Sequence, residues 1–191
     1  MKKEFFDSCA EKWGSPNEEK LELIKQNILP LLELKKGERV LDACCGTGVL
    51  IPLLKDAGAK ITGIDYSEKM IEKAEERYGE SARFIAGNVE DIPFKNESFD
   101  KIIMHNSFPH IDGKKKMFAQ CYRTLKSGGI FLISHDMSRK DTDEHHKKCH
   151  HSVSSDMLPS NKEITLFAAS SGFETIEILD EESFFAIVCR K

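Results

Sequence analysis

"RVLDACCGTGVL", residues 39–50, joins a short apolar run to a glycine-containing turn and a second apolar run. The first run has the composition of a buried strand, and Gly46 and Gly48 permit a tight turn after it. One acid, Asp42, lies near the end of the predicted strand, just before the turn. A strand followed by a glycine turn and a helix is typical of the first unit of a parallel sheet, where ligands bind at the carboxyl ends of strands.

Short apolar runs and longer amphipathic segments alternate from this stretch onward. Strands are predicted over 39–44, 60–65, 82–87, 99–106 and 129–135, and helices over 48–58, 67–79 and 114–129. Such alternation predicts a parallel sheet covered by helices on both faces. Ser67 has the side chain of a helix N-cap. The glycines expected to end the helices are Gly58, Gly79 and the pair Gly128 and Gly129.

The C-terminal part of the chain has a different pattern. A helix is predicted over 161–173, followed by strands over 174–180 and 183–191. The two residues between these strands are too few for a crossover helix, so the pair is expected to be an antiparallel hairpin. The predicted fold is therefore α/β and Rossmann-like: a doubly wound, mostly parallel seven-stranded sheet with an antiparallel C-terminal hairpin.

Length and composition favour one domain spanning residues 1–191. Within it we expect an N-terminal helical cap (1–36), a ligand-binding core (37–135), a histidine-rich insertion (136–160) and a C-terminal helix and hairpin (161–191). The net charge of −4 argues against broad nucleic-acid binding, and no apolar run approaches the length of a membrane span. A cytoplasmic monomer or homodimer acting on a small molecule is expected, with six reduced cysteines.

The acids around the glycine turn narrow the class of ligand. A dinucleotide fingerprint needs a small residue where this chain has Ile51, and Asp42 would repel a pyrophosphate but attract a cationic amine. Asp65 ends the second strand, where a carboxylate commonly accepts ribose hydroxyls. A ligand with a ribose, a positive charge and no phosphate fits both acids. S-adenosylmethionine has these properties.

Five motifs in order carry a resemblance to a known family. They are "VLDACCGTG" (40–48), "GIDYSEKMIEKA" (63–74), "GNVEDIPF" (87–94), "FDKIIMHNSFPHI" (99–111) and "RTLKSGGIFLISH" (123–135). Their order and spacing resemble those of the class I S-adenosylmethionine-dependent methyltransferases. They are most similar to the small subgroup related to the quinone-biosynthesis C-methyltransferases.

The resemblance implies roles for individual residues. The turn would hold the methionine part of the cofactor, Asp65 the ribose, and the positions after the second and third strands the adenosine. His105, with Asn106, would lie beside the methyl-bearing end. The residues that it assigns to the cofactor are Asp42, Ala43, Cys44, Gly46, Gly48, Asp65, Tyr66, Met70, Asn88, Val89 and His105.

This chain departs from the family pattern at two of these positions, and some roles have structural alternatives. Cys44 replaces the usual first glycine of the turn, and Asn88 replaces the usual aspartate, although an amide keeps both a donor and an acceptor. Met70 could instead pack in the core, and Asp65 could cap the following helix. Cys44 and its neighbour Cys45 are expected to act as small buried apolar residues.

The histidine-rich segment after the fifth predicted strand is the least generic part of the chain. Its His145, His146, Cys149 and His150 have helical spacing that could hold a transition metal. It could equally form a polar lid or contact the methyl acceptor. In the family this segment often closes over the acceptor, and aromatic residues near the N-terminus could complete the cover. Those residues are Phe5, Phe6 and Trp13.

The implied reaction is an in-line displacement in which a small-molecule acceptor attacks the methyl group and S-adenosylhomocysteine leaves. Alignment supplies much of the acceleration, so a base is not required. If one acts, the candidates are His110, His135 and His146, because histidine titrates near neutral pH. Two alternatives stay open: an NAD-type oxidoreductase on a related fold, and a non-catalytic module that senses the cofactor or a metal.

Overall fold

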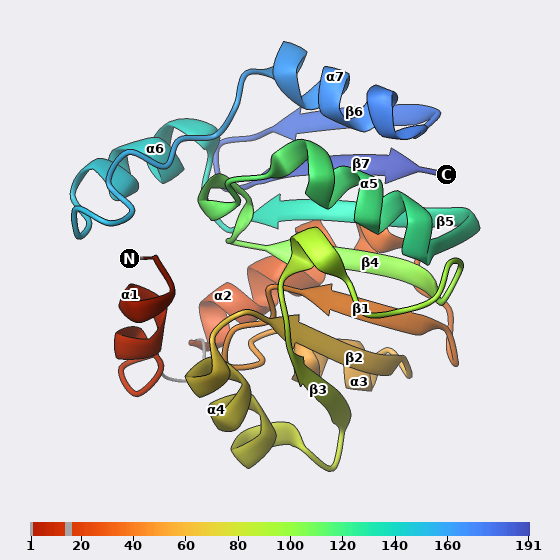
Figure 1. Cartoon of the computed structure of the whole chain (residues 1–191), viewed down its shortest axis with the longest axis horizontal. Coiled ribbons are helices and arrows are strands. Elements are labelled where there is room, and N and C mark those ends of the chain that lie inside the picture. Colours follow the sequence, from red (N-terminus) through yellow and green to blue (C-terminus); the bar gives the residue numbers. More distant parts are fainter. Residues whose placement is uncertain (1, 14–16) are drawn as a thin grey trace.

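A computed structural model of the chain describes residues 2–13 and 17–191. Its centre is a seven-stranded sheet in the order β3-β2-β1-β4-β5-β7-β6 (Figure 1). Six strands share one direction, and β7 runs antiparallel between β5 and β6. The strands are β1 (Arg39–Ala43), β2 (Lys60–Asp65), β3 (Ala82–Ala86), β4 (Phe99–His105), β5 (Leu125–His135), β6 (Thr175–Asp180) and β7 (Phe185–Arg190). The predicted sheet and its antiparallel hairpin are confirmed.

Helices cover both faces of this sheet. Two apolar clusters lie on opposite sides of it, one beneath α5 and α7 and the other beneath α3 and the N-terminal turns (Figure 1). The helices are α1 (Lys2–Cys9), α2 (Glu18–Leu23), α3 (Ile51–Asp56), α4 (Glu68–Tyr78), α5 (Lys114–Thr124), α6 (Arg139–Lys147) and α7 (Asn161–Ser171). Among the described residues, none of these helices has the length and apolar character that crossing a membrane requires.

Short helical turns complete the described elements. After α2 come a π-helical turn, η1 (Ile24–Ile28), and a 3-10 turn, η2 (Leu29–Leu32), in which Pro30 ends the regular pattern. Two further 3-10 turns follow β3 and β4, namely η3 (Val89–Asp91) and η4 (Phe108–His110). Both lie at the same edge of the sheet as the ends of the parallel strands.

One local expectation differs from the structure. The glycine pair Gly128 and Gly129 does not end α5, which stops at Thr124; the pair lies within β5 and hydrogen-bonds Lys191 instead. The tertiary pairing of this segment with β7 therefore overrides the local stop signal. The histidine-rich segment after β5 contains a helix, α6, which Ser138 caps through its side chain.

The path of the chain through the sheet determines where a ligand site can form. The chain moves outward from β1 through β2 to β3, then returns to place β4 on the other side of β1. Between β1 and β4 the connections leave toward opposite faces, which opens a crevice at the carboxyl ends of the strands. Figure 1 shows α1 and α6 beside this edge of the sheet.

Candidate active site

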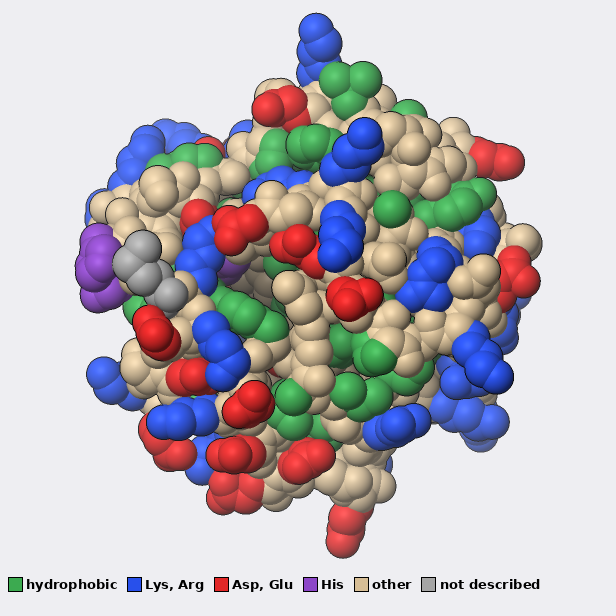
Figure 2. Space-filling model, viewed as in Figure 1, with side chains coloured by type: hydrophobic (Ala, Val, Ile, Leu, Met, Phe, Trp, Pro, Cys, Tyr) green, Lys and Arg blue, Asp and Glu red, His purple; other side chains and the backbone are tan. Residues whose placement is uncertain are grey.

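A cavity of about 600 Å³ occupies this crevice. Its wall includes residues from the ends of β1, β2, β4 and β5 together with residues of α1, α2 and α6. In Figure 2 the surface is hollowed here, with hydrophobic side chains inside the hollow and charged side chains around it. An open parallel sheet is expected to bind its ligand at this place.

The glycine turn between β1 and α3 forms one wall of the cavity. Gly46 has φ +52° and donates its backbone N–H to Asp65 Oδ2 at 2.9 Å, and a Cβ atom added to it would meet nothing within 4 Å. Gly48 has φ +87° and lies against the Tyr78 ring, where an added Cβ would come within 2.7 Å. Gly46 therefore leaves room for a ligand, whereas Gly48 allows the turn to pack closely on α4.

Cys44 and Cys45 point to different sides of the sheet. Cys44 packs against the apolar cluster beneath α5 and α7, and Cys45 is buried in the opposite cluster. Burial raises the pKa of both thiols well above its usual range, so neither is a reactive thiolate at neutral pH. Cys45 is thus the small buried apolar residue that was expected, whereas Cys44 is half-buried and also lines the cavity.

The two acids of the cavity occupy different environments. Asp42 is 2 % exposed and its Oδ2 has no hydrogen-bond partner among the described residues. Burial, and then the charge of Asp65, raise the pKa of Asp42 to about 8. Burial also raises the pKa of Asp65, to about 6, although backbone N–H groups of Ser67 and Gly46 oppose the shift. A cation beside Asp42 would supply the counter-charge that this carboxyl lacks.

The ends of β2 and β3 supply the adjoining wall. Tyr66, Asn88 and Val89 line it, and Asn88 Oδ1 accepts the backbone N–H of Glu90 at 2.8 Å. Met70 also lines the cavity but is 1 % exposed and belongs to a cluster with Phe6 and Val153. Ser67 caps α4 as predicted, with its side chain accepting the Met70 N–H at 3.2 Å.

The ends of β4 and β5 bring buried polar groups to the opposite wall. His105 Nδ1 lies 3.0 Å from Ser134 Oγ, and its Nε2 is buried without a partner in the described chain. Burial lowers the pKa of His105 to about 4, so the ring is neutral at physiological pH. His135 and Thr142 likewise each have a buried side-chain atom, Nε2 and Oγ1, without a described partner. Burial lowers the pKa of His135 to about 3.

An ion pair fixes the end of β5. The side chain of Asn106 donates to Asp136 Oδ1 at 2.9 Å, and Lys20 of α2 lies 2.9 Å from Asp136 Oδ2. Burial, the largest single influence, acts to raise the pKa of Asp136, but the hydrogen bonds from Lys20 and Asn106 and the nearby positive charge together outweigh it, and the pKa is lowered. Asp136 is therefore a buried carboxylate whose charge is already compensated.

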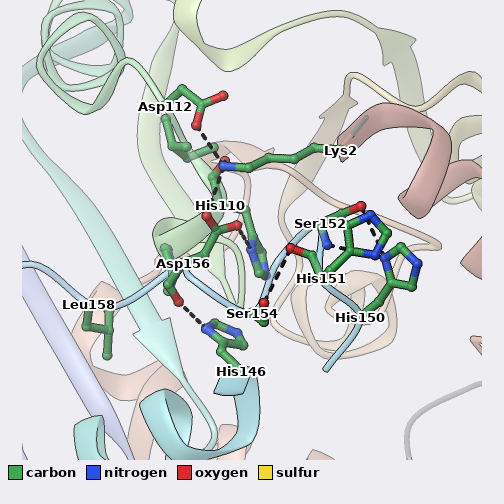
Figure 3. Close-up of polar contacts among 12 residues, drawn as sticks. Lys2, His110, Asp112, His146, His150, His151, Ser152, Ser154, Asp156 and Leu158 are labelled. Atoms are coloured by element: carbon green, nitrogen blue, oxygen red, sulfur yellow. Dashed lines mark hydrogen bonds and ion pairs between the residues drawn. The ribbon is translucent and has the colours of Figure 1, made fainter. Parts of the chain in front are cut away.

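Asp156 connects the N-terminal helix to the histidines of the cavity (Figure 3). Its Oδ1 lies 3.0 Å from Lys2 Nζ, and its Oδ2 lies 2.9 Å from His110 Nδ1. The backbone carbonyl oxygen of the same residue lies 2.5 Å from His146 Nδ1. The aromatic residues predicted to cover the site are also here: Phe5, Phe6 and Trp13 all line the cavity.

The candidate metal ligands do not gather into a metal-binding group. Over the described residues, no three His, Cys, Asp or Glu side chains lie in an arrangement that could hold a metal ion. His145, His146 and Cys149 line the cavity. The fourth candidate, His150, is not among the lining residues and stacks on Phe5 with ring centroids 5.2 Å apart. The structure gives the metal hypothesis no support.

Most residues assigned to the site from the sequence do meet in the cavity. The residues that line it are Asp42, Cys44, Gly46, Asp65, Tyr66, Met70, Asn88, Val89, His105, His110, His135 and His146. Ala43 and Gly48 are not among the lining residues. Sequence reasoning missed Lys20, Asp136 and Asp156. Of these, Asp136 could have been found, because it directly follows the end of β5.

Comparison with known proteins shows that part of the chain is similar to one family. Residues 41–133 match the family model described as a methyltransferase domain. A demethylmenaquinone methyltransferase of Thermotoga maritima is 34% identical over 111 residues, covering 57% of this chain and 48% of the relative. A sterol 4-C-methyltransferase of Caenorhabditis elegans is 29% identical over 148 residues, covering 72% and 44%. The chain thus spans about half the length of these curated relatives.

The solved structures agree on the fold. An S-adenosylmethionine-dependent methyltransferase from Aquifex aeolicus superposes with a TM-score of 0.76 at 21% identity, covering 96% of this chain and 97% of that one. Its likeness therefore extends beyond the matched family segment to the N-terminal helices and the C-terminal hairpin. Residues 41–133 match a methyltransferase domain, and the resemblance to the S-adenosylmethionine-dependent methyltransferases drawn from the five motifs is confirmed.

Proposed function

We propose that the protein transfers the methyl group of S-adenosylmethionine to a small-molecule acceptor. The observation that carries this proposal is the unpartnered, buried carboxyl of Asp42 beside a glycine turn and a second acid, Asp65. A cationic ligand without phosphates would compensate Asp42, and its ribose hydroxyls would find an acceptor in Asp65. The open space at Gly46 supports the approach of the ligand to the turn.

The other residues assigned to the cofactor have contacts that suit their roles. Asn88 Oδ1 already accepts the Glu90 N–H, so its amide N–H groups are left to donate to an adenine ring nitrogen. Tyr66, Met70 and Val89 supply apolar surface on the same wall. Each carboxylate oxygen of Asp65 accepts one backbone N–H and retains a lone pair for a hydroxyl.

Methyl transfer needs alignment more than acid or base chemistry. Bound S-adenosylmethionine supplies an electrophilic methyl group on a sulfonium sulfur. The chain orients the acceptor between the ends of β4 and β5, and the cover formed by Phe5 and Phe6 excludes water from the cavity. His110, His135 and His146 all line the acceptor side, where a proton released by the acceptor would be taken up.

Calorimetric titration tests the cofactor half of the proposal. S-adenosylmethionine and S-adenosylhomocysteine are expected to bind, and NAD is not. Asp65→Asn removes a charged acceptor of hydroxyl groups, so it should weaken S-adenosylhomocysteine binding by about tenfold or more. Asp56→Asn is the matched control, because Asp56 is exposed at the end of α3 and outside the cavity lining. Binding of NAD without binding of either S-adenosyl compound would overturn the proposal.

Methyl uptake tests the transfer itself. The protein, incubated with a small-molecule extract and S-adenosylmethionine carrying a labelled methyl group, is expected to label at least one extract component. The Asp65→Asn variant should label it more slowly at limiting cofactor concentration. Cofactor binding with no labelled component in extracts from several growth conditions would favour the non-catalytic sensing module.

A further inference from the structure

Two of the histidines in the cavity are held by a single residue. The carboxylate oxygen Oδ2 of Asp156 lies 2.9 Å from His110 Nδ1, and the backbone carbonyl oxygen of Asp156 lies 2.5 Å from His146 Nδ1 (Figure 3). The two imidazole rings are neighbours, with centroids 4.8 Å apart. Both residues line the same cavity.

These contacts determine where each ring carries its proton. A carbonyl oxygen can only accept a hydrogen bond, so His146 must donate from Nδ1. The Asp156 carboxylate is paired with Lys2 at 3.0 Å and also accepts, so His110 too must donate from Nδ1. Burial lowers the pKa of His110, with the hydrogen bond to Asp156 opposing the shift. In the neutral ring, a proton on Nδ1 leaves Nε2 as a lone-pair acceptor.

In the described part of the chain, the lysine that lies beside His110 is already engaged by carboxylates. Lys2, beside His110, is engaged by Asp112 at 2.7 Å as well as by Asp156. Phe6 packs edge-on against the His110 ring with centroids 5.2 Å apart. His135, on the same side of the cavity, is buried and neutral. A ligand group that approaches the two rings therefore meets their lone pairs, apolar surface and the hydroxyl of Thr142, which lies one turn before His146 in α6.

We propose that His110 and His146 form a hydrogen-bond-accepting subsite that binds the methyl acceptor through an O–H or N–H group, with Asp156 as its positioning residue. The subsite deepens the proposed function and rests on it for the identity of the ligand as the methyl acceptor. A carboxylate or phosphate at the same place would face two lone pairs, so it is disfavoured. The acceptor class is an alcohol, phenol or amine with an apolar body that packs against Phe6.

The tautomers provide the first test, and they need no ligand. In the full-length protein labelled with 15N at histidine, long-range 1H–15N correlation spectra are expected to show both His110 and His146 protonated at Nδ1. Asp156→Ala removes the carboxylate but keeps the backbone carbonyl. It should therefore release the tautomer of His110 and leave that of His146 unchanged. Protonation at Nε2 of both rings in the unmodified protein would overturn the proposal without requiring any variant.

Three small probes provide the second test: phenol, anisole and benzoate, titrated into the protein saturated with S-adenosylhomocysteine. Phenol is expected to bind more tightly than anisole, which lacks the donor, and than benzoate, which is an anion. His110→Phe keeps a ring against Phe6 but removes the acceptor nitrogen, so phenol should bind about fivefold more weakly, the effect of one lost hydrogen bond. Anisole binding should not fall in this variant.

The exposed His151 gives a matched control, since His151→Gln lies outside the cavity lining and should leave phenol binding unchanged. If His110→Phe does not fold, His146→Phe serves as a second variant, and it too should bind phenol about fivefold more weakly. Equal binding of phenol and anisole, preference for benzoate, or no phenol binding at millimolar concentration would overturn the subsite. Failure of the proposed function can be told apart from failure of the subsite. In the first case the protein does not bind S-adenosylhomocysteine in calorimetry, and the tautomer spectra still test the subsite without any ligand.

Discussion

Cys44 occupies a backbone conformation that residues with a Cβ atom rarely adopt. Its φ is +62°, in the left-handed region, at the position where the family usually has glycine. The left-handed conformation costs a non-glycine residue about 1 kcal/mol or more. The side chain recovers part of this cost, because it packs against the core cluster beneath α5 and α7.

Because of this strain, a variant with glycine at position 44 should be more stable than one with alanine, the reverse of the usual order. Cys44→Ala and Cys44→Gly both remove the sulfur, and they differ in the Cβ atom that the left-handed conformation disfavours. We expect Cys44→Gly to be more stable than Cys44→Ala by about 1 kcal/mol in urea denaturation. The control pair is Cys121→Ala and Cys121→Gly within α5, where alanine should be more stable by about 1 kcal/mol. The same order at both positions would contradict the prediction.

At the scale of elements, α1 is attached to the rest of the molecule differently from the other helices. It packs through a small cluster centred on Phe6, which is separate from the two core clusters of the sheet. The Phe6 ring meets those of Trp13, Tyr66 and His110 at centroid distances between 5.2 and 6.0 Å. Local opening of α1 therefore need not disturb the sheet.

Phe6→Ala tests this independence. The variant is expected to lose hydrogen-exchange protection in α1 and in residues 148–156, while β4 and β5 keep theirs. Mass spectrometry of peptides after deuterium labelling measures both regions in one experiment. Leu166→Ala on α7 is the control, because Leu166 is 58% exposed and its removal should leave α1 protected. Loss of protection throughout the sheet would mean that α1 is part of the global folding unit.

The order of elements could be predicted from the sequence because it depends on local periodicity. Strand and helix patterns predicted the alternation, and the short link between the last two predicted strands predicted the hairpin, although four residues rather than two separate β6 from β7 in the structure. The end of α5 could not be predicted, since the pairing of Gly128 with Lys191 depends on tertiary structure. The position of Asp156 was missed for the same reason, because its contact with His110 joins residues 46 positions apart.

At the scale of the whole molecule, the unsatisfied buried polar atoms are concentrated at one place. In the part of the chain that the structure describes, four buried side-chain atoms lack a hydrogen-bond partner, and they belong to Asp42, His105, His135 and Thr142. All four residues line the cavity between the ends of the parallel strands. Elsewhere in the described fold, buried polar side chains are satisfied, as stability requires. The protein thus sacrifices stability at the site where a ligand would restore the missing contacts.

The pH dependence of the free energy of unfolding measures how much the buried carboxyl of Asp42 destabilises the protein. The pKa of its carboxyl is about 8 in the folded protein and 3.8 as the reference value, so between these pH values the folded state binds the proton more tightly. The contribution of Asp42 to stability is therefore lost as pH rises from about 4 to about 8.

The variant Asp42→Asn removes this titration. In urea denaturation, the stability of the variant relative to the unmodified protein should increase as pH rises from about 4 to about 8 and then level off. Glu72→Gln, at an exposed position of α4, makes the same change in net charge and is the control. A stability difference between Asp42→Asn and the unmodified protein that stays constant with pH would show that Asp42 ionises normally in the fold and needs no cation to compensate it.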